Sequence, residues 1–260
     1  MLTRLTWQDE TLRRVGGALG EYREFVYLSD AKLQQFSLPR RLALPSALRL
    51  NTPVGGVDVD APAADSERDR MRQLEKLDKH LGQRAEWFAQ PGLRPGQWVW
   101  FEAPLRCVTL QGDYQHMVLF ADPAPGEDPS YEQQVGCRLL LHGSSRHLRG
   151  FAPVAVEAPA LEGIEGGSSF GTTFLTTAGQ AVRALSLEHD AAAEGVRPPS
   201  GLNGSGVREL LEAIDVRHGQ VPGAWMSGLA RVTAELPATD TAVRCVVASP
   251  LNVEYVRDPA

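Results

Sequence analysis

Residues 97–110 read Gln-Trp-Val-Trp-Phe-Glu-Ala-Pro-Leu-Arg-Cys-Val-Thr-Leu, a run rich in the aromatic and β-branched side chains that favour β-strands. A Gly-Asp turn signal follows at residues 112–113, and the apolar residues 117–121 return as a second strand, which predicts a hairpin. Pro104 has no amide hydrogen, so it predicts an edge strand or a bulge inside the first arm.

The large aromatic side chains of this run divide between the two faces of the strand. Trp98 and Trp100 share one face and Phe101 lies on the other, because side chains alternate along a strand. Such aromatic residues can stack on nucleic-acid bases or pack in a core. In an acidic chain we expect a core role on at least one face.

Helices are predicted on the N-terminal side of the hairpin. Residues 23–28 form a short strand, and Ser29 or Asp30 caps a short helix directly after it. Residues 66–89 show a helical period that ends at Gln90-Pro-Gly. The apolar stripe of this helix consists of Met71, Leu74, Leu77, Leu81 and Phe88.

The C-terminal side adds further strands. Residues 122–130 form a loop, and residues 135–141 form a third strand. A helix is predicted over residues 207–214, and residues 229–236 and 241–256 form a second hairpin. Strands that arrive in pairs with helices between them favour an α+β fold, a mixed or antiparallel sheet covered by helices.

The organisation of the chain is that of one α+β domain over residues 1–260. Residues 151–224 differ from the rest because Gly, Ser, Thr, Ala and Pro dominate there, so we interpret them as a helical, loop-rich insertion. A chain of 260 residues is long enough to bury a substantial core.

Composition excludes several classes of protein. With 43% hydrophobic and 22% charged residues the chain is not globally disordered, and its net charge of −6 makes nucleic-acid binding an unlikely function. No apolar run is long enough to cross a membrane, and acidic residues interrupt the N-terminus where a signal peptide needs an apolar stretch. The three cysteines are far apart and lack C-x-x-C spacing, so we expect buried thiols and a cytoplasmic location.

The main candidate site directly follows the third predicted strand. It comprises His142, Gly143, Ser144, Ser145, Arg146, His147 and Arg149. Gly143 is expected to allow a tight turn, so that the amides near Ser144 and Ser145 face an anion while the basic side chains supply positive charge. The alternative is an ordinary turn with solvated basic residues.

Catalytic interpretations of the same segment are incomplete. A hydrolase or transferase could use Ser144 or Ser145 with a histidine base, but the G-x-S-x-G motif is absent. Ser29 and Lys32 match S-x-x-K without its companion motifs, and helix capping explains them better. No histidine has the spacing of a metal site, so we predict no catalytic residue, no metal and no cofactor.

Three phrases of the sequence resemble a family of uncharacterised actinobacterial proteins. They are Phe25-Val-Tyr-Leu-Ser-Asp-Ala-Lys-Leu33, Leu139-Leu-Leu-His-Gly-Ser-Ser-Arg-His-Leu148 and Val247-Ala-Ser-Pro-Leu-Asn-Val-Glu254. The resemblance implies no activity and no site residue, and it places relatives near signalling or conflict genes.

Taken together, these features predict a non-catalytic sensor or adaptor in a cytosolic regulatory or defence pathway. It would bind a small anionic ligand or nucleotide, or a protein partner encoded by a neighbouring gene. A hydrolase or transferase that uses the loop at 142–147, and a structural assembly subunit, are the alternatives.

Overall fold

The structure is a computed structural model that describes residues 23–36, 63–110, 114–150, 154–155, 178, 180–185, 202–218 and 222–256. Both helices and strands are present, so the predicted α+β class is confirmed. Within the described ranges, the strands form one mixed sheet that includes both parallel and antiparallel pairs.

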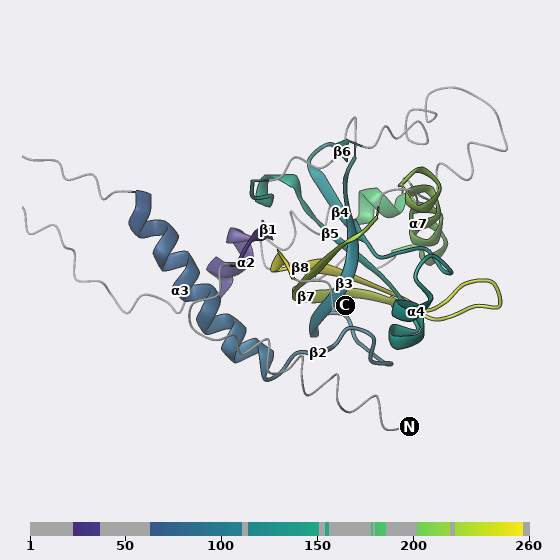
Figure 1. Ribbon diagram of the computed structural model, residues 1–260, viewed down its shortest axis with the longest axis horizontal. Helices are drawn as coiled ribbons and strands as arrows, with labels where there is room; N and C mark the ends of the chain where they lie inside the picture. Colours follow the sequence, from purple (N-terminus) through teal and green to yellow (C-terminus); the bar gives the residue numbers. More distant parts are fainter. Residues whose placement is uncertain are drawn as a thin grey trace, which may run out of the picture.

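Five strands of this sheet close into a barrel, which the sequence analysis did not predict. They are β3 (Trp98–Thr109), β4 (Met117–Ala121), β5 (Arg138–Ser144), β7 (Ala224–Leu236) and β8 (Cys245–Pro250). Hydrogen bonding runs in the order β3, β4, β5, β8, β7 and returns to β3 (Figure 1). Closure is possible because β3 is long: residues 98–105 pair with β7, and residues 106–109 pair with β4.

The predicted hairpin of β3 and β4 is confirmed, but β3 is not an edge strand. Pro104 lies opposite Trp225 of β7, and the pairing with β4 begins two residues later at Arg106. The proline therefore lies beside the change of partner, where a missing amide hydrogen costs least.

Shorter strands extend the barrel. β9 (Asn252–Tyr255) pairs with β7, and β1 (Phe25–Leu28) pairs with β9. β2 (Glu86–Trp87) and β6 (Val154–Ala155) each lie parallel to β3. The first and last described strands are thus neighbours in the sheet.

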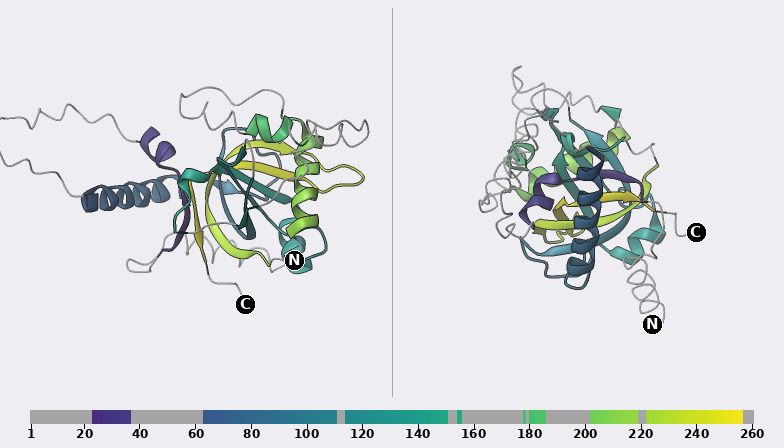
Figure 2. Two further views of the ribbon diagram at one scale, coloured as in Figure 1. Left: turned by 90° about the horizontal axis from the view of Figure 1, so that it is seen from above. Right: turned by 90° about the vertical axis from the view of Figure 1, so that its left-hand side faces the viewer.

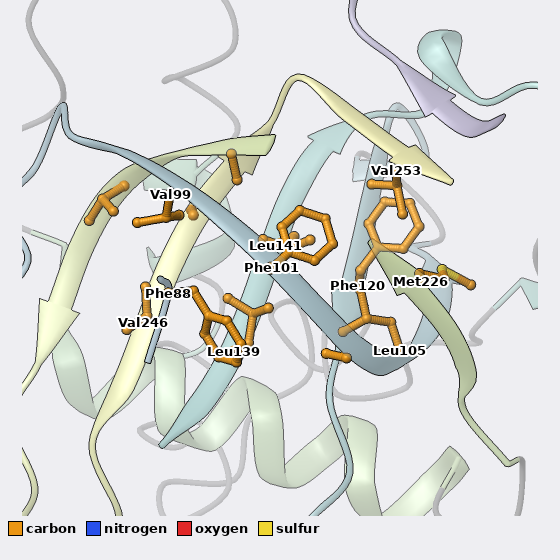
Figure 3. Packing of buried hydrophobic residues seen from close by; sticks show 14 of the residues in the cluster. Phe88, Val99, Phe101, Leu105, Phe120, Leu139, Leu141, Met226, Val246 and Val253 are labelled. Carbon is orange, nitrogen blue, oxygen red and sulfur yellow. The ribbon is translucent and has the colours of Figure 1, made fainter. Parts of the chain in front are cut away.

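The main core lies inside the barrel. Alternate residues of every barrel strand form one buried cluster, and because the ring is closed their common face is its interior (Figure 3). Members of the cluster include Val99, Phe101, Leu105, Val118, Phe120, Leu139, Leu141, Val246 and Ala248. The expected division of the aromatic residues is confirmed, since Phe101 lies in this cluster and Trp100 lies in a cluster outside it.

Helices cover two parts of the outer surface. α7 (Gly204–His218), which contains the helix predicted over residues 207–214, packs Val207, Leu210 and Leu211 onto the outer faces of β4, β5 and β8. α3 (Ala63–Gly82) packs Leu74, Leu77 and Leu81 near Trp100. The two helices lie on opposite sides of the barrel (Figure 2).

Some predicted boundaries are wrong. α3 begins at Ala63 and ends at Gly82, and Phe88 lies inside the barrel after β2 rather than on the helix stripe. α4 (Pro129–Val135) was not predicted. Val135, which was expected to begin the third strand, is the last residue of this helix, and β5 begins only at Arg138.

Most of the proposed insertion at 151–224 lies outside the described residues, and the division into domains stays a prediction. In the part of the chain that the structure describes, no helix has both the length and the apolar character needed to cross a bilayer. All three cysteines are free thiols, two of them buried and Cys107 partly so. Burial raises the pKa of each thiol to about 12, so these cysteines are poor nucleophiles.

Candidate functional site

The first part of the predicted loop is a strand. β5 continues through His142, Gly143 and Ser144, all of which are buried, so the predicted tight turn at Gly143 is wrong. A β-carbon at position 143 would lie 2.6 Å from the Tyr27 hydroxyl oxygen, so glycine is required here for close packing. The amide of Ser145 donates to the carbonyl of His116 at 2.7 Å, so it does not face a ligand.

His142 is separated from the rest of the candidate site. Its side chain is fully buried, and its Nε2 atom lies 2.9 Å from the Thr233 hydroxyl oxygen on β7. A surface ligand cannot contact this side chain without rearrangement of the barrel wall.

The second part of the predicted loop lies beside β1 and α2 (Asp30–Gln35). Residues 145–147 form a short 3₁₀ turn, and the Arg149 amide then donates to the Val26 carbonyl at 2.9 Å. These contacts hold the basic residues of 146–149 against the start of α2. Two segments that are far apart in the sequence therefore form one polar cluster.

Ser29 sets the start of α2. Its hydroxyl accepts a hydrogen bond from the Lys32 amide at 3.4 Å, which confirms the capping interpretation of the S-x-x-K match. The buried Lys32 ammonium donates to the Ser249 hydroxyl at 2.5 Å and to the Pro250 carbonyl at 2.9 Å. Lys32 thus links α2 to the end of β8.

Asp30 lies at the centre of this polar cluster. Its Oδ2 atom accepts from Arg149 Nη2 at 2.8 Å and from Arg70 Nη1 of α3 at 3.5 Å. About one third of each of these three side chains is exposed: 32% for Asp30, 33% for Arg149 and 34% for Arg70. We call the group formed by Asp30, Lys32, Arg70, Arg146, His147 and Arg149 the Asp30 cluster.

His147 is the least exposed predicted residue of this cluster. Its ring lies edge-on to Tyr27 with centroids 5.7 Å apart, and Arg146 Nε lies 3.4 Å from its Nε2 atom. Burial, followed by the charge of Arg146, lowers its pKa to about 4, and Asp30 only partly opposes this. The imidazole is therefore neutral at pH 7.

The Ser145 hydroxyl is not aligned with a histidine base. The Ser145 hydroxyl donates to the Gln115 carbonyl at 3.2 Å rather than to a histidine. Among the residues whose placement is described, no group of three or more His, Cys, Asp or Glu residues could hold a metal ion.

A second polar group is structural in character. The Arg138 guanidinium pairs with the fully buried Asp122 at 2.8 Å and with Asp215 of α7 at 2.9 Å. The Tyr131 hydroxyl donates to Asp122 at 3.1 Å. Burial outweighs the nearby Arg138 and raises the pKa of Asp122 to about 6. These groups satisfy one another and join α7 to the barrel.

Of the seven predicted site residues, the structure brings Arg146, His147 and Arg149 together in the Asp30 cluster. His142 and Gly143 are enclosed in the barrel wall, and neither they nor Ser144 and Ser145 form the predicted anion-binding turn. Asp30 and Lys32 were not predicted as site residues. Their capping spacing was visible, but their contacts with β8 and Arg149 depend on the tertiary fold.

A family model described as a family of unknown function (DUF7019) matches residues 23–257 of the chain. No curated protein matches the chain, and no solved structure matches it.

Proposed function

The chain belongs to the DUF7019 family, whose function is unknown, and we propose that it is a non-catalytic module that binds a small anionic ligand at the Asp30 cluster. One observation carries this proposal: two neighbouring arginines have few partners. Among the described residues, Arg149 has a single carboxylate partner, Asp30, which it shares with Arg70. Arg146 forms no ion pair with any described residue and is exposed.

The chemistry of the site favours an oxyanion. A guanidinium group offers a planar fork of N–H donors that matches carboxylate and phosphate oxygens. Within the part of the chain that the structure describes, the Nε atom of Arg149 is buried and has no hydrogen-bond partner. An unpaired buried donor costs free energy that an added acceptor recovers. An anion beside Arg146 and Arg149 would satisfy that donor.

Binding is tested by titrating the full chain with sulfate, phosphate, citrate and adenosine monophosphate, followed by calorimetry and thermal shift. We expect the Arg146→Ala and Arg149→Ala variants to bind at least about tenfold more weakly, because each removes a charge-assisted hydrogen bond. Arg72→Ala is the matched control, since Arg72 on α3 is 73% exposed and lies outside the cluster, and it should keep the original affinity. Equal binding by Arg149→Ala, or no binding by the unsubstituted chain, would contradict the proposal.

Sulfate is expected to bind more tightly as the pH falls from about 7.5 to about 5. In the free protein the pKa of His147 is about 4, because of its burial and the positive charges of Arg146, Lys32 and Arg149, with only Asp30 opposing them. A bound anion raises the pKa of His147. At a pH between the pKa of the free protein and that of the complex, His147 therefore takes up a proton when sulfate binds. Sulfate keeps its charge over this range and does not titrate itself.

His147→Gln is the control for this pH dependence, because glutamine occupies similar space and does not titrate. Its sulfate affinity should stay nearly constant over the same range. A steep pH dependence that persists in His147→Gln would assign the proton to another group.

The cellular role completes the proposal. We propose that the module works in the cytoplasm as a sensor or adaptor in a regulatory or defence pathway, together with a protein partner encoded by a neighbouring gene. Copurification with the products of adjacent genes, in the presence and absence of the bound anion, tests this role. No contact in the described structure favours the hydrolase or transferase alternative.

A further inference from the structure

We infer that the ligand presents a dianionic phosphate group and that it binds by displacing the Asp30 carboxylate from Arg149. The inference rests on the proposed function, because it concerns the same cluster. It makes Asp30 an internal competitor that holds the binding arginine in the absence of ligand.

The geometry of the ion pair suggests this exchange. Arg149 and Arg70 both donate to the same oxygen of Asp30, Oδ2. The other oxygen, Oδ1, is buried and has no hydrogen-bond partner among the described residues. On the other side of the pair, Arg149 donates through Nη2 and its Nε atom has no acceptor. A complete carboxylate–guanidinium pair uses two oxygens and two N–H groups. The Asp30–Arg149 pair therefore leaves one donor and one acceptor unused.

The charge of the ligand follows from the competition. A ligand carboxylate carries the same single charge as Asp30, which is already tethered beside Arg149 and so has a high effective concentration. A dianionic phosphate offers twice the charge and three oxygens, enough to contact Arg149 Nε and Nη2 together and to reach Arg146. It therefore competes with Asp30 where a carboxylate does not.

Access to the pair is open. Arg149 and Asp30 each keep about one third of their side chain exposed, and Arg146 is exposed beside them. A phosphate group can thus reach the exposed part of the pair without opening the barrel. Arg149 Nε is buried in the absence of ligand, so the displacement of Asp30 must uncover it. Asp30 keeps its contact with Arg70 when it leaves Arg149.

The test compares the full chain with its Asp30→Asn variant at about pH 8, where phosphate is dianionic. Asparagine keeps the shape of the side chain and removes its charge. We expect inorganic phosphate to bind at least about tenfold more tightly to Asp30→Asn, because the competing carboxylate is gone. Acetate is expected to bind far more weakly than phosphate to the unsubstituted chain. Adenosine monophosphate and vesicles containing phosphatidic acid serve as further probes that separate soluble and lipid sources of the phosphate.

A second measurement keeps the inference testable if Asp30→Asn folds poorly. In the unsubstituted chain labelled with ¹⁵N, phosphate should shift the Arg149 Nε–H signal and slow its exchange with water. An unchanged Arg149 signal would overturn the inference.

The outcomes separate this inference from the proposed function. Equal or weaker phosphate binding by Asp30→Asn, with binding by the unsubstituted chain still lost in Arg149→Ala, overturns the competition and leaves the anion site standing. Acetate binding as tight as phosphate binding overturns the assignment of a dianion. If neither the unsubstituted chain nor Asp30→Asn binds any of these anions, both proposals fail.

Discussion

Replacing Arg138 with methionine is expected to lower the free energy of unfolding by about 3 to 5 kcal/mol at about pH 8. The guanidinium bridges Asp122, which is fully buried, and Asp215 of α7. Methionine fills much of the same space but leaves the Asp122 carboxylate buried without its main cationic partner. It also removes the link between α7 and the barrel.

The size of this loss should depend on pH. Burial raises the pKa of Asp122 from 3.8 to about 6. The stability that this raised pKa contributes comes from the protonated carboxyl group. It is therefore fully present below about pH 4 and is lost as the pH rises through 6. Without Arg138 the pKa rises further, so the carboxyl group is neutral at pH 5 and its burial costs less there.

Urea denaturation of Arg138→Met at about pH 5 and pH 8 measures the difference. The double variant Asp122→Asn with Arg138→Met is the matched control, and it should recover a large part of the stability lost at pH 8. An equal loss at both pH values, or no recovery in the double variant, would show that Arg138 stabilises the fold by packing alone.

Gly228→Ala is expected to lower the free energy of unfolding by about 3 kcal/mol or more. Gly228 lies on β7 opposite Phe101 of β3. A β-carbon here would fall inside the van der Waals radius of the Asn252 carbonyl oxygen and 3.0 Å from the end of the Phe101 ring. The substitution therefore forces β9 away from β7 where the barrel meets its outer strands.

Gly204→Ala is the control for this prediction. A β-carbon at Gly204 meets only Leu236 Cδ2, at 3.3 Å, and a flexible side-chain end can move aside. Gly204 also begins α7, where alanine favours the helix. We expect a change within about 1 kcal/mol in urea denaturation. The explanation by backbone clash would be wrong if both variants were equally stable.

Local signals predicted much of the secondary structure. The β-branched run that became β3, the cap at Ser29 and the apolar spacing of α7 each depend on neighbours in the sequence. The boundaries of α4 were also accessible, because Asp128 caps this helix, Pro129 begins it and Gly136 ends it. The prediction instead placed Asp128 and Pro129 in a loop and Gly136 in the third strand.

Closure of the barrel was beyond such signals. It depends on the pairing of β3 with β7, which lie far apart in the sequence at residues 98–109 and 224–236, and no local period specifies that register. The helix predicted over residues 66–89 extends too far toward the C-terminus for a similar reason. Phe88 continues the spacing of Leu74, Leu77 and Leu81, yet it belongs to the barrel core, and the helix has already ended at Gly82.

The candidate site was predicted in part for the same reasons. The basic character of Arg146, His147 and Arg149 is visible in the sequence, but their neighbour Asp30 comes from a distant segment. Gly143 was interpreted as a turn residue because glycine is common in turns. The structure instead explains it by Tyr27, whose ring occupies the space of the missing β-carbon.

The pairing of β1 with β9 means that the ligand site is assembled late during synthesis. Lys32 is anchored to Ser249 and Pro250, and β1 pairs with β9. A nascent chain that has not yet emerged from the ribosome as far as these residues lacks these C-terminal contacts of β1 and α2. Contacts over such sequence distances also slow folding. Anion binding would thus report that the entire barrel has formed, and truncated translation products would lack it.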